Sequence, residues 1–216
     1  MSTDELIARL VRDHRPVKRS SQPRILFAEW SAICLLFLAV GVLLIGARND
    51  LAAMWRQSAF IVHTLIVFSV TVLAAAAAFK ASIPDREQRF AVASLAVALA
   101  AWLAWLVAAS VTASEPHAGS GWRCLRNIVV LAAPLGVLMY YMIGRAAPLR
   151  TGTAGWLATL SAASAADLAT RFICRNDHAF HSLIWHFIPV LVLGCTGVIL
   201  GRVVFRWEAA DRTARS

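Results

Sequence analysis

Two of the four cysteines lie where a thiol can react. Cys124 and Cys174 each have two arginines within three residues along the chain. Cationic neighbours favour the thiolate over the thiol, and the thiolate is the form that reacts with oxidants and binds metals. Cys34 and Cys195 fall in apolar stretches, where a free cysteine usually packs as a small apolar residue. We therefore expect Cys124 and Cys174 to be the reactive pair.

Histidine and acidic residues lie close to the reactive pair in the sequence. Glu115 and His117 precede Cys124, whereas Asp177, His178 and His181 follow Cys174. Thiolate and imidazole together suit soft metals, so Cys124, Cys174, His178 and His181 are a candidate metal site. Their spacing matches no recognised zinc pattern, and ordinary polar loops would explain the same residues. We expect no permanent cofactor and leave transient heavy-metal binding open.

The elements that must hold these residues are membrane-spanning helices. Of the 216 residues, 59% are hydrophobic and 15% are charged, and the mean hydropathy is +0.66; in soluble domains about a quarter of the residues are charged. A helix needs roughly 20 apolar residues to cross the hydrocarbon, and a span in lipid must satisfy its own backbone groups. The charge-free stretches are 30–47, 57–79, 90–114, 127–144, 151–166 and 178–201. We predict an all-α polytopic membrane protein with six transmembrane helices.

The fifth stretch is the most polar of the six. It contains Gly155, Ser161 and Ser164 among many alanines, and Asp167 follows it directly. Small residues suit close helix packing rather than lipid exposure. Asp167 precedes Arg171 by about one helical turn, so we expect a local ion pair between them. An ion relay is the alternative for an acid in a span, and it would fit a small transporter.

The basic residues predict the orientation. With the N-terminus in the cytoplasm, 15 of the 21 Lys and Arg residues lie on the cytoplasmic side and six on the other. The positive-inside rule then favours both termini in the cytoplasm. We divide the chain into an N-terminal tail (1–24), a six-helix transmembrane domain (25–205) and a C-terminal tail (206–216). Arginines beside anionic lipid headgroups account for the net charge of +9, so we expect a lipid bilayer around the chain and no direct contact with nucleic acid.

This topology brings the reactive pair to one surface. The fourth and fifth predicted helices are joined by a short turn, so they are expected to be antiparallel neighbours. Cys124 lies 23 residues before Ala147 and Cys174 lies 27 residues after it, a difference of about 6 Å along a helix axis. The two thiols can therefore meet at the outer surface. Whether they approach closely enough for a disulfide is left open.

The N-terminal tail predicts a short amphipathic helix. Ser2 and Glu5 fit a capping box, and the apolar residues recur at helical spacing until Pro16. The apolar stripe consists of Leu6, Ile7, Leu10 and Val11. A helix of about three turns is marginal in water, so its stripe needs a surface to bury against. The membrane interface and a cytoplasmic protein partner are both open.

A series of short motifs covers nearly the whole chain. The motifs are Asp4-Glu5-Leu6-Ile7, Pro16-Val17, Gly46-Ala47-Arg48-Asn49-Asp50-Leu51, Trp122-Arg123-Cys124-Leu125, Ala147-Pro148, Gly152, Ala154-Gly155, Cys174, Trp185, Gly197, Gly201-Arg202 and Arg206-Trp207. Their joint order resembles the NrsF family, the negative regulators of sigma F, which are anti-sigma factors of the bacterial inner membrane. Asn49 departs from the proline expected there, and the segment after Cys174 is unusually rich in histidine.

The resemblance implies a function and a partner. It implies a six-helix, multi-pass inner-membrane protein, not an enzyme, that holds a cytoplasmic extracytoplasmic-function (ECF) sigma factor inactive until stress reaches the periplasm. The two outer cysteines of that family correspond to Cys124 and Cys174 and are linked to oxidative or heavy-metal stress. The tail stripe then becomes the expected sigma-binding surface. The alternatives are a membrane thiol oxidoreductase, which would normally need a second cysteine pair, and a small transporter.

Overall fold

The structure, a computed structural model, describes residues 2–12, 22–82, 89–112, 119–146 and 148–205. These residues form α-helices, one short π-helix (η1) and connecting turns, with no β-strand among them. The bounds are α1 Thr3–Arg12, α2 Pro23–Ile45, α3 Leu51–Met54, α4 Ser58–Ala81, α5 Arg89–Thr112, α6 Trp122–Gly144, α7 Thr151–Arg171, α8 Ala179–Ser182, η1 Leu183–Phe187 and α9 Ile188–Val204.

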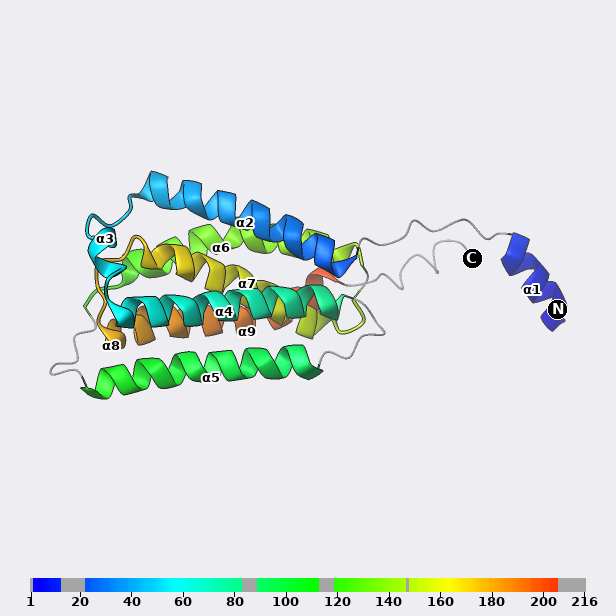
Figure 1. The fold of residues 1–216 in the computed structure, drawn as a ribbon. Helices are drawn as coiled ribbons and strands as arrows, with labels where there is room; N and C mark the ends of the chain where they lie inside the picture. The colour runs from blue at the N-terminus through cyan, green and yellow to red at the C-terminus, as the bar shows by residue number, and fades with distance from the viewer. Residues whose placement is uncertain (1, 13–21, 83–88, 113–118, 147, 206–216) are drawn as a thin grey trace.

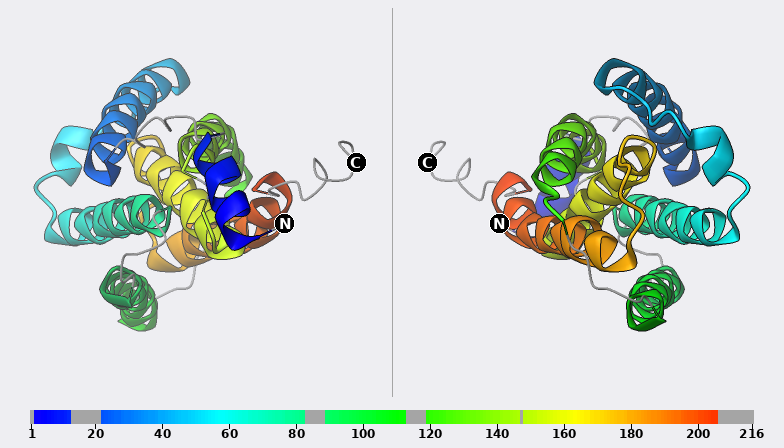
Figure 2. Two further views of the ribbon diagram at one scale, coloured as in Figure 1. Left: turned by 90° about the vertical axis from the view of Figure 1, so that its right-hand side faces the viewer. Right: turned by 90° about the vertical axis from the view of Figure 1, so that its left-hand side faces the viewer.

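The long helices lie side by side in one bundle (Figure 1). Helix α2 begins and α9 ends at the same end of the bundle, and the short helices α3 and α8 lie at the opposite end. Figure 2 shows the bundle along its length, with α7 between its neighbours. Helix α7 packs most extensively against α9, α4 and α6. It is therefore the central helix of the fold.

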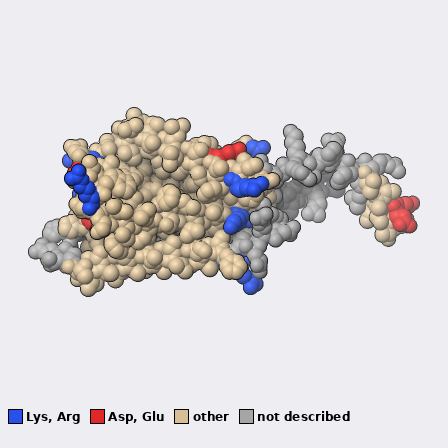
Figure 3. All heavy atoms as spheres, in the orientation of Figure 1, with Lys and Arg blue, Asp and Glu red and all other residues tan. Residues whose placement is uncertain are grey.

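Five helices are long and apolar enough to cross a membrane: α2, α4, α5, α6 and the continuous helix Ala179–Val204. Leucines on α2 such as Leu35, Leu43 and Leu44 are exposed on the outside of the bundle, where lipid would cover them. Figure 3 shows the charged side chains at the two ends and an uncharged band between them. The predicted all-α class is confirmed, and five of the six predicted spans coincide with these helices.

The remaining predicted span corresponds to α7, which is enclosed by the other helices. Nearly every residue from Ala154 to Arg171 is buried, including Ser161, Ser164 and Asp167. Hydroxyl and carboxyl groups are costly to expose to hydrocarbon, whereas a neighbouring helix can offer them partners. The close packing predicted from the small residues of this stretch is confirmed.

The contact between α7 and α9 depends on glycine. Gly155 lies so close to α9 that a Cβ atom there would collide with the carbonyl oxygen of Gly197 and the backbone of Gly201. The Tyr140 hydroxyl of α6 joins this contact, because it donates to the carbonyl oxygens of Gly155 (3.1 Å) or Gly197 (3.1 Å). Its ring also stacks on Phe205. Three helices are thus fastened together around Tyr140.

The N-terminal helix has the predicted cap. The Ser2 N–H donates to Glu5 Oε2 (2.8 Å), and the Glu5 N–H donates to Ser2 Oγ (3.2 Å), which is a reciprocal capping box. On α1, Leu6, Ile7 and Val11 are 41%, 53% and 69% exposed. The Leu10 side chain and the predicted stop at Pro16 lie outside the described residues. The apolar stripe therefore has exposed members, and Figure 1 shows α1 apart from the bundle.

A substitution at Gly155 tests the close helix contact. We expect Gly155→Ala to lower the free energy of unfolding by about 1–3 kcal/mol, because the methyl group must push α7 and α9 apart. Chemical denaturation of the detergent-solubilised protein measures this. Gly136→Ala is the matched control, since its Cβ would meet only Ala162 at an ordinary 3.8 Å. Equal losses in the two variants would contradict the close contact.

Candidate functional site

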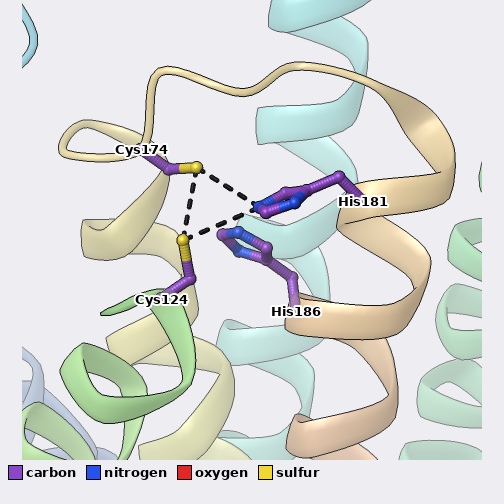
Figure 4. A group of neighbouring side chains, drawn as sticks. All are labelled: Cys124, Cys174, His181 and His186. Atoms are coloured by element: carbon purple, nitrogen blue, oxygen red, sulfur yellow. Dashed lines mark hydrogen bonds between the residues drawn. The ribbon is translucent and has the colours of Figure 1, made fainter. Parts of the chain in front are cut away.

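Cys124 and Cys174 meet at the end of the bundle that carries α3 and α8 (Figure 4). Cys124 lies in the first turn of α6, and Cys174 follows the end of α7 by three residues. Their Sγ atoms are 3.3 Å apart, with Cys124 donating to Cys174. Both cysteines are free thiols in the structure. The structure therefore brings together the pair that the sequence singles out.

Two histidines complete the group. His181 Nε2 lies 3.7 Å from Cys124 Sγ and 3.6 Å from Cys174 Sγ. One ring nitrogen of His181, one of His186 and the two sulfurs all lie within 4.8 Å of one another. Figure 4 shows both imidazole rings projecting toward the sulfurs. We call these four residues the Cys2His2 cluster.

The cluster differs from the predicted set at one position. His178 is exposed on the surface, where its backbone N–H donates to Asn176 Oδ1. The structure does not bring it to the cysteines. His186, which the sequence analysis did not include, is buried beside them instead.

A local change of helix type places both histidines on one side. Residues five apart in an α-helix point about 140° away from each other, so His181 and His186 would normally face different surroundings. The segment Leu183–Phe187 is π-helical, and hydrogen bonds to the fifth residue widen the turn so that such residues become neighbours. Pro189 lacks the N–H that an α-helix would need for the carbonyl of Trp185, which accounts for the change. The two rings are 5.6 Å apart.

His186 is held by a buried acid. Its Nδ1 lies 2.6 Å from Asp167 Oδ1, and both side chains are almost wholly buried. The expected ion pair between Asp167 and Arg171 is wrong for this fold. Arg171 lies with Nη1 2.7 Å from His63 Nδ1 instead, in contact with α4. The sequence signal that could have pointed to His186 is Asp167, since a buried carboxylate requires a partner and a histidine on another helix can supply it.

An arginine between two acids holds the segment that carries Cys174. Arg48 is buried, and its guanidinium makes two bonds to Asp50 (2.7 and 2.9 Å) and two to Asp177 (2.9 and 2.6 Å). Its backbone N–H donates to the carbonyl of Phe172 (2.9 Å). Paired bonds of this kind fix both geometry and charge. The turn after α2 therefore fastens the segment from Phe172 to Asp177 at both ends.

The charges of this arrangement shift two pKa values. The hydrogen bonds from Arg48 hold the pKa of Asp50 at about 2. The ion pair between Arg48 and Asp50 is therefore complete at neutral pH and is lost only as the pH falls toward that value.

The hydrogen bond from the Cys124 thiol, assisted by His181, lowers the pKa of Cys174 well below that of an ordinary thiol. The arginines that flank Cys174 in the sequence predict the same direction, but the hydrogen bond from the neighbouring sulfur is the main cause. Of the two thiols, Cys174 is therefore the one that loses its proton more readily.

The start of α6 is held against the histidine helix. Trp185 covers Gly121 so closely that any side chain at that position would collide with the indole ring. The indole N–H also donates to the carbonyl oxygen of Gly119 (3.1 Å). Cys124 is consequently fixed relative to His181 and His186. The cluster joins the neighbouring ends of α6, α7 and the helix that begins at α8.

Fold and cluster define the class: an all-helical protein with five helices apolar enough to cross a membrane, and with paired thiols and imidazoles where three helices meet. The chain belongs to the NrsF family, described as negative regulator of sigma F, whose profile matches residues 10–207. It is also similar to the anti-sigma-F factor NrsF of Caulobacter vibrioides, with 28% identity over 96% of this chain and 100% of that protein. No solved structure matches.

The thiol pair can be tested through its pH dependence. In a background with Cys34 and Cys195 replaced by alanine, Cys124→Ala removes the donor that lowers the pKa of Cys174, whereas Cys124→Ser keeps a hydroxyl donor. Iodoacetamide reacts with the thiolate, so alkylation of Cys174 slows as the pH is lowered through its pKa. We expect this slowing to begin at a higher pH in the alanine variant than in the serine variant, measured by mass spectrometry between about pH 5 and 9. Identical profiles would show that the sulfur–sulfur hydrogen bond does not form.

Proposed function

We propose that this chain is a membrane-bound anti-sigma factor that holds a cytoplasmic ECF sigma factor inactive and releases it under stress. The family match over residues 10–207 carries this proposal. The relative that aligns with nearly the whole chain is named for the same activity. The role is regulatory, with no catalysis.

The proposed topology has six spans in the bacterial inner membrane and both termini in the cytoplasm. Helix α7 is the sixth span, since it runs the length of the bundle among the five apolar helices. It lacks their hydropathy because its neighbours, and not lipid, surround it. The end of the bundle where α2 begins and α9 ends faces the cytoplasm, in agreement with the 15 basic residues assigned to that side. The Cys2His2 cluster then faces the periplasm.

The proposed sigma-binding surface is the apolar stripe of α1, which consists of Leu6, Ile7, Leu10 and Val11. Its described members are exposed and have the spacing of an amphipathic helix that lies in a groove of a partner. The tail precedes the first span, so it can contact a cytoplasmic protein while the packing of the bundle stays unchanged.

The proposed sensor is the pair Cys124 and Cys174, and the observation that supports it is their separation of 3.3 Å. Oxidation to a disulfide needs the sulfurs to approach to about 2.05 Å, and a bound metal would bridge them. Either event changes how the ends of α6 and α7 are held. A stimulus shifts an equilibrium only through different affinities for its two states, so release requires that one packing of these helices favours the modified cluster.

The tail interface predicts a loss of sigma binding on charge insertion. We expect Leu6→Asp with Leu10→Asp to weaken binding about 100-fold or more, since each side chain contributes roughly 1.5–3 kcal/mol when buried. The amount of sigma factor that co-purifies with each variant from detergent-solubilised membranes measures this binding. The control, Arg9→Ala with Arg12→Ala, changes the net charge equally and leaves the stripe intact. Undiminished binding by the aspartate variant would remove the tail from the interface.

The proposed sensor predicts that cysteine variants still bind the sigma factor but no longer release it under stress. We expect Cys124→Ser, Cys174→Ser and the double variant to keep the sigma factor bound and to block its release by oxidant or heavy metal, because no bridge can form between the sulfurs. A reporter gene under sigma control measures release. Cys195→Ser, on the exposed side of α9, should respond normally. Normal release in the double variant would assign sensing to other residues.

A further inference from the structure

We infer that Cys124, Cys174, His181 and His186 together bind one thiophilic divalent cation, of the Zn²⁺ and Cd²⁺ class, with Asp167 as a positioning residue behind His186. The inference deepens the proposed sensor and rests on the proposed function for its regulatory meaning. The binding itself rests on the geometry of the cluster.

The four ligand atoms already lie close to the positions of a tetrahedral site. With metal–sulfur bonds of about 2.3 Å and metal–nitrogen bonds of about 2.0–2.1 Å, a tetrahedral site places two sulfurs about 3.8 Å apart and a sulfur and a nitrogen about 3.5–3.6 Å apart. The sulfurs are 3.3 Å apart, and His181 Nε2 is 3.7 and 3.6 Å from them. The ligand atom of His186 lies within 4.8 Å of the other three. Forming the site needs the sulfurs to move apart by about 0.5 Å and the His186 ring to move toward the other three ligands.

The second observation is an unsatisfied atom on His186. Among the residues that the structure describes, His186 Nε2 is buried and has no hydrogen-bond partner. When the Asp167 carboxylate accepts from Nδ1–H, the lone pair lies on Nε2, which is the metal-binding tautomer. Buried polar atoms without a partner are rare in proteins, and a cation beside Nε2 would remove this one. Carboxylate, imidazole and metal in series are a common arrangement in metalloproteins.

The ligand set also determines which cation is taken. Two thiolates and two neutral imidazoles carry a charge of −2, which a divalent cation balances. Sulfur and imidazole ligands favour Zn²⁺ and heavier soft ions over Mg²⁺ and Ca²⁺, which prefer oxygen. Four protein ligands fill the tetrahedral coordination shell and leave no position for water or substrate, as in structural metal sites. Binding must release the protons that remain on the thiols, so affinity falls at low pH.

Cobalt and cadmium titrations of the reduced, detergent-solubilised full-length protein test the inference. One equivalent of Co²⁺ should give the intense visible bands of a tetrahedral site, and Cd²⁺ should displace it and add thiolate-to-metal charge-transfer absorption. His186→Ala should lose the tetrahedral bands, and Asp167→Asn should weaken binding about 10–100-fold. His178→Ala is the matched control and should bind like the native chain. A Cys34→Ala, Cys195→Ala background confines the signal to the cluster.

The outcomes separate the inference from the proposed function. The inference is overturned if the native chain gives no tetrahedral spectrum, if the spectrum survives in His186→Ala, or if it is lost in His178→Ala. Release of the sigma factor by oxidant in a chain that binds no metal would leave the proposed function standing without this site. A tetrahedral spectrum that depends on His186, in a chain that never binds a sigma factor, would support the site and contradict the function.

Discussion

The enclosure of α7 is the constraint on which the rest of the structure depends. This helix carries hydroxyl groups, a carboxylate and an arginine that hydrocarbon cannot solvate, so it must be surrounded by protein. Its neighbours meet that need with small residues, and Gly155 allows α9 to approach until backbones touch. Leaving a buried carboxylate such as Asp167 without its partner would cost several kcal/mol. The apolar helices therefore surround a polar one, and its buried Asp167 and Arg171 each meet a histidine of a neighbouring helix.

The same enclosure creates the cluster. Asp167 must find a partner within the bundle, and it finds His186 on the helix that packs most closely against α7. Once His186 is turned inward, the π-helical segment brings His181 beside it, and Cys124 and Cys174 occupy the adjoining ends of α6 and α7. The Cys2His2 cluster is thus assembled around the partner of one buried acid, with Arg48 and Trp185 holding the surrounding segments.

The sequence predicted the helices and the cysteine pair well, because both follow from simple periodicities. Runs without charge locate the spans, and a rise of about 1.5 Å per residue is enough to bring Cys124 level with Cys174. His186 could not be chosen in the same way. Its five-residue distance from His181 argues against a shared site in an α-helix, and only the π-helical segment before Pro189 reverses that conclusion. The partner of Asp167 was missed for a related reason: Arg171 is near in sequence, whereas His186 is near through tertiary packing.

The size of the possible movement limits how the proposed sensor could release a partner. Cys124 and Tyr140 lie 16 residues apart on α6, or about 24 Å. Closing the sulfurs from 3.3 Å to a disulfide moves them by about 1 Å, a tilt of roughly 3° about the Tyr140 contact. So small a displacement does not by itself expel a partner. The signal must lie in the energy difference between two packings, and reversing a 99:1 population takes about 5.5 kcal/mol. Structural zinc sites contribute about 10–16 kcal/mol, so a site complete in only one packing has enough free energy to drive that reversal.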